Sequence, residues 1–320
     1  PNLVKSARMI IVIYTGYIIS GTLLYIYFGM NWFDALNHSI AALSTGGFST
    51  KAESIGYYGS FGIEAVTIVL MLLGSTNFLA HLYLIRGGGK NFFRYCEVKF
   101  QLILCALAAP VLSAFLIYGG LEGHVGQGFR DGLFQVVTAL TTTGFQTVPS
   151  FAVWSSPLIL VMTLLMLIGG GTGSTAGGIK QIRVCIMLKS LCWSIRSKIS
   201  QKRLIHADGI YRISGYEYLK AEERLEASDF ILLYLGVFAA GTFILCACGF
   251  GIGDSMFEFA SALGTVGLSV GITGYDASPV VLWTETVGML AGRLEIYVIF
   301  VAAVQFGREI KDGYKKTEGR

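Results

Sequence analysis

One short pattern occurs three times along the chain, each time between two long apolar segments. The copies run from Asp34 to Thr50, from Asp131 to Thr147 and from Asp254 to Val270, and they align without a gap. The shared positions are Asp34, Asp131 and Asp254; Ala42, Ala139 and Ala262; Leu43, Leu140 and Leu263; Thr45, Thr142 and Thr265; and Gly47, Gly144 and Gly267. Repetition at a spacing of about 100 residues predicts one structural unit used three times.

The apolar segments around these copies have the length of membrane spans. The chain has 320 residues, of which 53% are hydrophobic and only 14% charged, whereas soluble domains carry about 25% charged residues. A helix that crosses a bilayer needs about 20 apolar residues. We predict spans at Met9–Phe28, Phe61–Ile85, Val98–Tyr118, Val153–Ile168 continuing to about Cys192, Phe230–Phe250 and Val280–Ala303. The expected fold is therefore an all-α integral membrane protein with three span–pore-helix–span repeats.

The repeats and the basic residues divide and orient the chain. We expect pore repeats at 1–85, 86–195 and 229–306, a polar linker at 196–228 and a tail at 307–320. Lys and Arg gather before the first span, after the second, after the fourth and after the sixth, while Lys51 and Arg130 are exceptions in the alternate connections. By the positive-inside rule, both termini, the linker and the tail are expected in the cytoplasm. The net charge is a modest +4.

The chemistry of each copy suits an ion. Asp at the start is expected to cap a short helix, and the Thr-x-Gly after it disfavours further helix because Gly is permissive and Thr is β-branched. Irregular backbone at membrane depth occurs only where protein covers it or where it lines a cavity. Its carbonyl oxygens can then replace the hydration shell of K⁺. The alternative is a set of capped helices that merely end in Gly turns.

A further segment interrupts the fourth predicted span with six glycines in ten residues. Each glycine disfavours helix by about 1 kcal/mol relative to Ala. The segment consists of Gly169, Gly170, Gly171, Thr172, Gly173, Ser174, Thr175, Ala176, Gly177 and Gly178. One alternative is a dinucleotide site, but no strand of a βαβ unit precedes the segment and no acidic residue follows about 20 residues later. Another alternative is a helix–helix packing surface of small residues. A milder break at Gly74–Asn77 is open to interpretation as a kink.

The combination of these segments resembles the Trk/Ktr/HKT superfamily of potassium transporters. Ser44–Thr50, Thr141–Thr147 and Gly264–Ser269 are similar to its second, third and fourth filter loops, and Gly169–Lys180 is similar to its intramembrane loop. Arg203–His206 and Gly292–Ile296 resemble the TrkH branch. The filter residues implied are Ser44, Thr45, Gly46, Gly47, Thr141, Thr142, Thr143, Gly144, Gly264, Thr265, Val266 and Gly267, whose carbonyls would bind K⁺.

The resemblance also implies features that the residues alone do not. Members carry four repeats around one pore, so the first repeat is expected to be missing ahead of Pro1, together with the loop that helps to set potassium-over-sodium preference. The residues from Gly169 to Gly178 are expected to block the pathway below the filter until they move. Members form homodimers, with one pore in each protomer, in the plasma membrane and dock on a cytoplasmic ring that binds nucleotides. Potassium is expected as the substrate, with no covalent cofactor and no nucleic-acid partner.

Arg293 lies deep in the last predicted span, where a charge normally faces a cavity or a partner. We expect it near the glycine segment, as part of the barrier to cations. An ion pair with Glu285 or Glu295, or a side chain extended towards the cytoplasm, is the alternative. A sodium-permeable relative and a non-conducting scaffold are further alternatives for the whole chain. A membrane-embedded enzyme would need an acid/base or metal cluster, and neither the four His nor the six Cys show such spacing.

Overall fold

The computed structural model describes residues 3–85, 88–121, 124–199, 209–294, 296–299, 301–302, 304–306 and 308. Several sequence features lie outside this set: Arg86, Arg203–His206, Glu295 and, apart from Arg308, the basic residues of the tail. Within the described part, all six cysteines are free thiols.

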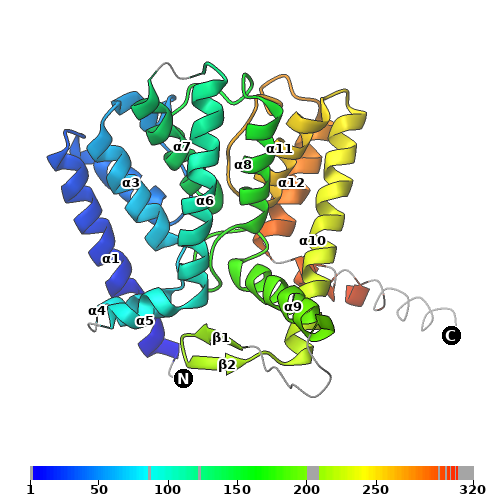
Figure 1. Cartoon of the computed structure of the whole chain (residues 1–320). Helices are drawn as coiled ribbons and strands as arrows, with labels where there is room; N and C mark the ends of the chain where they lie inside the picture. The colour runs from blue at the N-terminus through cyan, green and yellow to red at the C-terminus, as the bar shows by residue number, and fades with distance from the viewer. Residues whose placement is uncertain are drawn as a thin grey trace, which may run out of the picture.

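Each repeat is a group of helices that contact one another. The first contains α1 (Leu3–Tyr27), α2 (Trp32–Leu43), α3 (Phe61–Gly74) and α4 (Phe78–Ile85), with the 3₁₀ helix η1 (Ser54–Tyr58) after the turn. The second contains α6 (Cys96–Tyr118), α7 (Val125–Leu140), α8 (Ser156–Ile168) and α9 (Gln181–Ile199). The third contains α10 (Ala221–Ala247), α11 (Ile252–Leu263) and α12 (Pro279–Arg293). Figure 1 shows α7 and α11 among the longer helices, as pore helices should lie.

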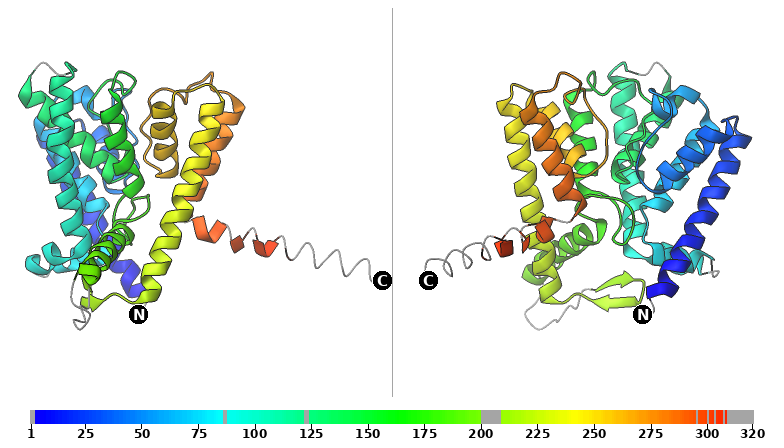
Figure 2. Two further views of the ribbon diagram at one scale, coloured as in Figure 1. Left: turned by 45° about the vertical axis from the view of Figure 1, so that its right-hand side comes forward. Right: turned by 180° about the vertical axis from the view of Figure 1, so that it is seen from behind.

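The repeats follow one another in a fixed order in space. Pore helix α7 of the second repeat packs against α3 of the first, and pore helix α11 of the third packs against α8 of the second. Arg130 of α7 strengthens the first of these contacts, because its Nε and Nη2 donate to both oxygens of Glu64 in α3 at 3.0 and 2.6 Å. Figure 2 shows α10 and α12 of the third repeat side by side, next to the other two repeats. In both cases the pore helix of one repeat therefore packs on the helix that follows the pore helix of the preceding repeat, here called the inner helix.

The first, outer helix of each repeat (α1, α6 and α10) is continuous, whereas the inner helices α3 and α12 belong to bent pairs. Three helices are long and apolar enough to cross a membrane unbroken, at Ala7–Tyr27, Cys96–Tyr118 and Ala221–Ala247, and two bent pairs raise the number to five at most. These pairs are α3 with α4, bent by 113°, and α12 with the helix Ile296–Phe306, bent by 105°. The predicted span at Phe61–Ile85 is therefore bent at the break noted at Gly74–Asn77, and the predicted span at Val280–Ala303 is bent after Arg293. Gly74 and Gly292 lie next to these bends and allow close approach to the pore-helix ends, since a Cβ at either would lie 2.3 or 1.8 Å from the carbonyl oxygen of Leu43 or Leu263.

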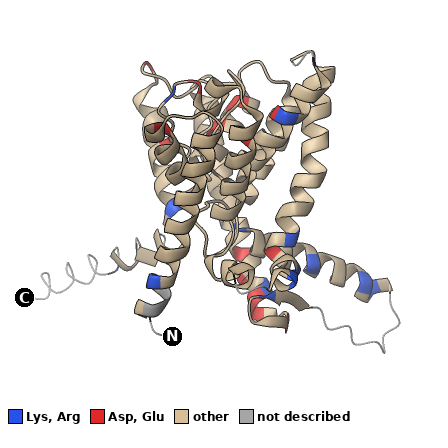
Figure 3. Cartoon of the chain, turned by 90° about the vertical axis from the view of Figure 1, so that its left-hand side faces the viewer, with Lys and Arg blue, Asp and Glu red and all other residues tan. Residues whose placement is uncertain are grey.

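The end of the molecule that holds α4, α5 (Gly89–Arg94) and α9 also carries the N-terminus and most of the Lys and Arg positions coloured blue (Figures 1 and 3). Strands β1 (Gly209–Arg212) and β2 (Gly215–Tyr218) form an antiparallel hairpin here. This hairpin was not anticipated within the predicted polar linker. It adds a small sheet to a fold that is otherwise helical.

Candidate ion pathway

The three pore helices end in the same backbone conformation. Ser44, Thr141 and Gly264 cap their C-termini, and the next residues, Thr45, Thr142 and Thr265, have φ of 50°, 52° and 53°. In each copy this Thr N–H bonds back to the carbonyl of the shared Ala, and the following N–H bonds one residue further back. That pairing is the Schellman motif, which normally places Gly in the left-handed position. A β-branched residue there is strained, so three matched copies indicate a selected geometry.

The glycine of each Thr-x-Gly also lies in the left-handed region. The φ angles of Gly47, Gly144 and Gly267 are 66°, 91° and 94°. Two of these glycines are fixed by the helix behind them, because Gly144 N donates to Thr138 Oγ1 and Gly267 N to Ser261 Oγ, both at 3.1 Å. The residue between each Thr and Gly has no positive φ. Alternation of this kind can turn successive carbonyl oxygens to one side.

Two pairs of these turns are in direct backbone contact. A Cβ added to Gly47 would lie 2.1 Å from Thr143 O, and one added to Gly144 would lie 2.0 Å from Val266 O. The first turn therefore abuts the second, and the second abuts the third, at equivalent positions. A Cβ on Gly267 would meet no described atom within 4 Å. The residues named as filter thus come together in one row of turns that is open beside Gly267.

The expectation that the shared Asp residues cap the pore helices was wrong. Asp34 and Asp131 instead bond to the chain that follows each turn. The N-caps are Asn31, His124 and Gly251. Asp34 and Asp131 accept hydrogen bonds from Thr50 and Thr147, at 2.5 and 2.6 Å. Because the helices begin upstream of the Asp residues, the carboxylates of Asp34 and Asp131 are free to accept these hydrogen bonds from the chain after each turn.

The third repeat uses another carboxylate, because Val270 stands where the other copies have Thr. Glu258 accepts from Ser269 Oγ at 2.6 Å and from Val270 N at 2.9 Å. Asp254 is exposed. The shared Asp therefore has a structural role in two repeats only.

The glycine segment between α8 and α9 is not helical and touches all three turns. Gly177 N donates to Thr142 Oγ1 at 2.7 Å, and a Cβ on Gly177 would lie 2.2 Å from Gly264 O. Thr45 Oγ1 donates to Thr175 Oγ1 at 3.1 Å. The interpretation as a helix–helix packing surface was therefore wrong. The segment lies directly against the side of the turns where the pore helices end.

A second set of contacts holds the other end of the glycine segment. Thr172 N donates to Glu97 Oε1 at 2.8 Å, and Thr172 O accepts from Asn77 Nδ2 at 2.6 Å. Glu97 is 2% exposed and also accepts from Tyr95 Oη. Sequence analysis did not single out Glu97. The signal that could have found it is a carboxylate at the start of an otherwise apolar span.

Arg293 contacts the glycine segment, as expected. Its Nη1 donates to Thr175 O at 3.1 Å, and it lines a cavity of about 270 Å³ together with Thr175, Gly177 and Lys180. Glu285, the candidate ion-pair partner, lies 2.8–2.9 Å from Thr273 Oγ1 instead. The other candidate, Glu295, lies outside the described residues. Arg293 thus puts a positive charge beside the loop.

Comparison with known proteins decides the family. A family model described as "TrkH: Cation transport protein" matches residues 1–308. The chain belongs to the TrkH family. It is accordingly a membrane-embedded protein of a family described as cation transport proteins.

Individual TrkH proteins agree in fold. The chain is 32% identical to the Trk system potassium uptake protein TrkH of Escherichia coli and 30% identical to that of Halomonas elongata, over 94% of this chain and 62% of each relative. The crystal structure of the potassium transporter TrkH from Vibrio parahaemolyticus matches with a TM-score of 0.83 and 27% identity, over 94% of this chain and 64% of that one. The chain thus spans less than two thirds of the length of these TrkH relatives.

Proposed function

We propose that this chain forms most of a potassium pathway, in which main-chain oxygens of the turns 44–47, 141–144 and 264–267 replace water around a dehydrated K⁺. The observation that carries the proposal is the direct contact of Gly47 with Thr143 O and of Gly144 with Val266 O. Turns that abut in this way can present their carbonyl oxygens to one ion. The pore helices behind them direct the negative ends of their dipoles towards the same place.

A fourth turn beside Gly267 completes the ring in this proposal. The open side of Gly267 supports it. Continuing the order of the repeats, the additional pore helix would pack on α12, and its inner helix would support α2. The preference for potassium over sodium is then shared between four turns.

The glycine segment is the gate in this proposal, and Arg293 adds an electrostatic barrier. A cation that leaves the turns towards α9 meets Thr175 and Gly177 first, because both contact the turns directly. It then meets the guanidinium that is bonded to Thr175 O. Opening requires this segment to leave the turns while α8 and α9 stay packed. The hydrogen bonds from this loop to the pore-helix ends and the turns are few, to Thr45, Leu43 O and Thr142, which suits a loop that moves.

The setting of the pathway follows from charge and family. We propose a plasma-membrane location with the termini, α9 and the hairpin on the cytoplasmic side, since basic residues gather at that end (Figure 3). A homodimer and a nucleotide-binding cytoplasmic ring, both implied by the family resemblance, belong to the same proposal. The ring would dock on the end that holds α9 and the hairpin.

Ion flux into liposomes tests the function. The protein, reconstituted together with any missing repeat, should carry K⁺ or Rb⁺ at least tenfold faster than Na⁺. Gly144→Ser should reduce that ratio strongly, because its side chain would meet Val266 O. Gly236→Ser, on α10 with open space around it, is the matched control. Equal K⁺ and Na⁺ flux would favour the sodium-permeable alternative, and an unchanged ratio in Gly144→Ser would count against the filter.

A further inference from the structure

We infer that a groove between α6, α9 and the hairpin binds an anionic phospholipid of the leaflet next to the hairpin. The groove has a volume of about 720 Å³. Its apolar wall comes from Phe100, Ile103 and Leu188, and its basic residues are Arg94, Lys99 and Lys189. The inference rests on the membrane orientation of the proposed function and is independent of ion selectivity.

A second, polar cavity continues the groove. It has a volume of about 230 Å³, is lined by Asn91, Arg212 and Ser214, and shares Arg94 and Tyr211 with the groove. An apolar channel and a polar pocket that share two residues match the two parts of a phospholipid. The acyl chains would lie along α6 and α9, and the head group would lie at Arg94.

The charges favour an anionic head group. No carboxylate lines either cavity among the described residues. Arg94 and Lys99 are exposed and form no ion pair within the described part of the chain. Lys189 donates to a neutral acceptor, Gly209 O, at 2.6 Å. Among the described residues, Arg212 is the basic residue of the two cavities that is compensated, by Glu223 and Glu217 at 3.0 and 3.4 Å. Basic pockets between helices at this face of a membrane bind anionic head groups.

Other occupants fit the groove less well. A free phosphate would use the polar cavity but would leave Ile103 and Leu188, which are 43% and 47% exposed, without a partner. A second copy of the chain related by twofold symmetry would bring the same basic residues together, and such like-charge contact is unfavourable. An anionic lipid satisfies both the apolar wall and the charges.

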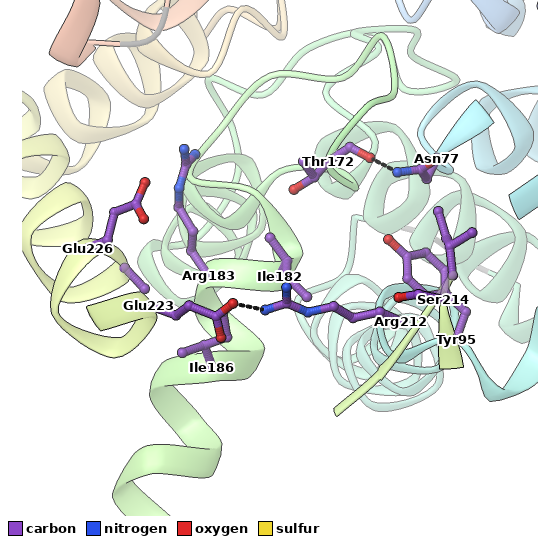
Figure 4. A pocket seen from close by; sticks show the side chains of 12 residues that line it. Asn77, Tyr95, Thr172, Ile182, Arg183, Ile186, Arg212, Ser214, Glu223 and Glu226 are labelled. Carbon is purple, nitrogen blue, oxygen red and sulfur yellow. Dashed lines mark hydrogen bonds and ion pairs between the residues drawn. The ribbon is translucent and has the colours of Figure 1, made fainter. Parts of the chain in front are cut away.

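The site is connected to the glycine segment through a third cavity. Arg212, Tyr95 and Ser214 line both the polar cavity and a neighbouring one of about 420 Å³ (Figure 4). That third cavity is also lined by Thr172 and Asn77, which are hydrogen-bonded to each other in Figure 4. A head group at Arg94 would therefore lie in a cavity adjacent to the one that contains the Asn77–Thr172 hydrogen bond of the glycine segment.

Lipid binding to the intact purified protein tests the inference. Native mass spectrometry with added phosphatidylglycerol or phosphatidylcholine should show at least tenfold tighter binding of the anionic lipid. The double variant Arg94→Gln/Lys99→Gln should weaken phosphatidylglycerol binding on the order of 20-fold, at roughly fivefold for each charge. Arg196→Gln/Lys198→Gln, on the exposed end of α9, is the matched control and should leave binding unchanged.

A groove variant guards against indirect effects. Leu188→Trp fills the apolar wall without changing charge, so it should also weaken binding of phosphatidylglycerol but leave binding of inorganic phosphate as it is. Equal binding of the two lipids, or an unchanged Arg94/Lys99 variant, would overturn the inference. Binding of inorganic phosphate as tight as that of the lipid would do the same, as would a protein dimer that the Leu188 variant dissociates. All readouts are of binding, so a protein that fails to select K⁺ can still pass.

Discussion

The turns after the pore helices are nearly alike in the three repeats, whereas the interruptions of the inner helices differ from one repeat to the next. The turns share their Schellman ends, their left-handed Thr and their left-handed Gly. The breaks do not agree: α3 bends by 113° after Gly74, α12 bends by 105° after Arg293, and the second repeat inserts a glycine segment with its own contacts. A site that surrounds one ion requires equivalent contributions from every repeat, whereas a gate needs a single repeat to move.

The largest expected effect is a difference in stability between matched glycine variants of the second and third turns. Ala at Gly144 or Gly267 must adopt a left-handed conformation, which costs about 1–2 kcal/mol. Ala at Gly144 also meets Val266 O at 2.0 Å, whereas Ala at Gly267 has open space. Gly144→Ala should therefore lower the free energy of unfolding by about 2 kcal/mol more than Gly267→Ala. Thermal unfolding in detergent measures both, and equal shifts would mean that the second and third turns do not touch.

The next effect tests the contact between a turn and the gate. Thr142→Val keeps the shape of the side chain but leaves the buried N–H of Gly177 without its acceptor. Such a loss costs about 1–3 kcal/mol and should release the glycine segment, which raises K⁺ flux. Thr163→Val is the control, since that hydroxyl bonds only within α8, to Ile159 O. Flux that falls in Thr142→Val and not in Thr163→Val would contradict a closed gate here.

A smaller effect separates the repeats at their outer ends. Asp34→Asn weakens the bonds from Thr50 and Tyr58 and removes the ion pair with Lys51 at 3.5 Å. We expect a loss of stability of about 1–2 kcal/mol, because bonds to a charged group are the stronger ones. Asp254→Asn, at the matching exposed position of the third repeat, should change stability by less than about 0.5 kcal/mol. An equal loss of stability in both variants would mean that Asp34 and Asp254 have the same role, which would contradict the different hydrogen bonds of the two residues.

The smallest effect concerns the charge beside the gate. Arg293 is exposed and donates one hydrogen bond within the described part of the chain, to Thr175 O, so Arg293→Gln should raise cation flux only about two- to tenfold. Arg308→Gln, an exposed basic residue at the C-terminal end of the described chain, serves as the control. Unchanged flux and unchanged gating in Arg293→Gln would remove Arg293 from the barrier.

Sequence alone located the turns but not their surroundings. The shared Ala, Thr and Gly positions can be aligned by eye, because local backbone geometry limits which residues fit a left-handed turn after a helix. The contact of Glu97 with Thr172 could not be predicted, since it joins residues 75 positions apart. Asp34 was misjudged because Asn31, three positions earlier, caps the helix. The close approach of Gly74 and Gly292 to pore-helix carbonyls likewise exists only in the folded chain.

Anomalous diffraction from crystals grown in Rb⁺ tests the central claim most directly. The account predicts an anomalous peak within coordination distance of main-chain oxygens from all three turns, at residues 44–47, 141–144 and 264–267. Rb⁺ found only at carboxylates, or absent from the space between the turns, would contradict it.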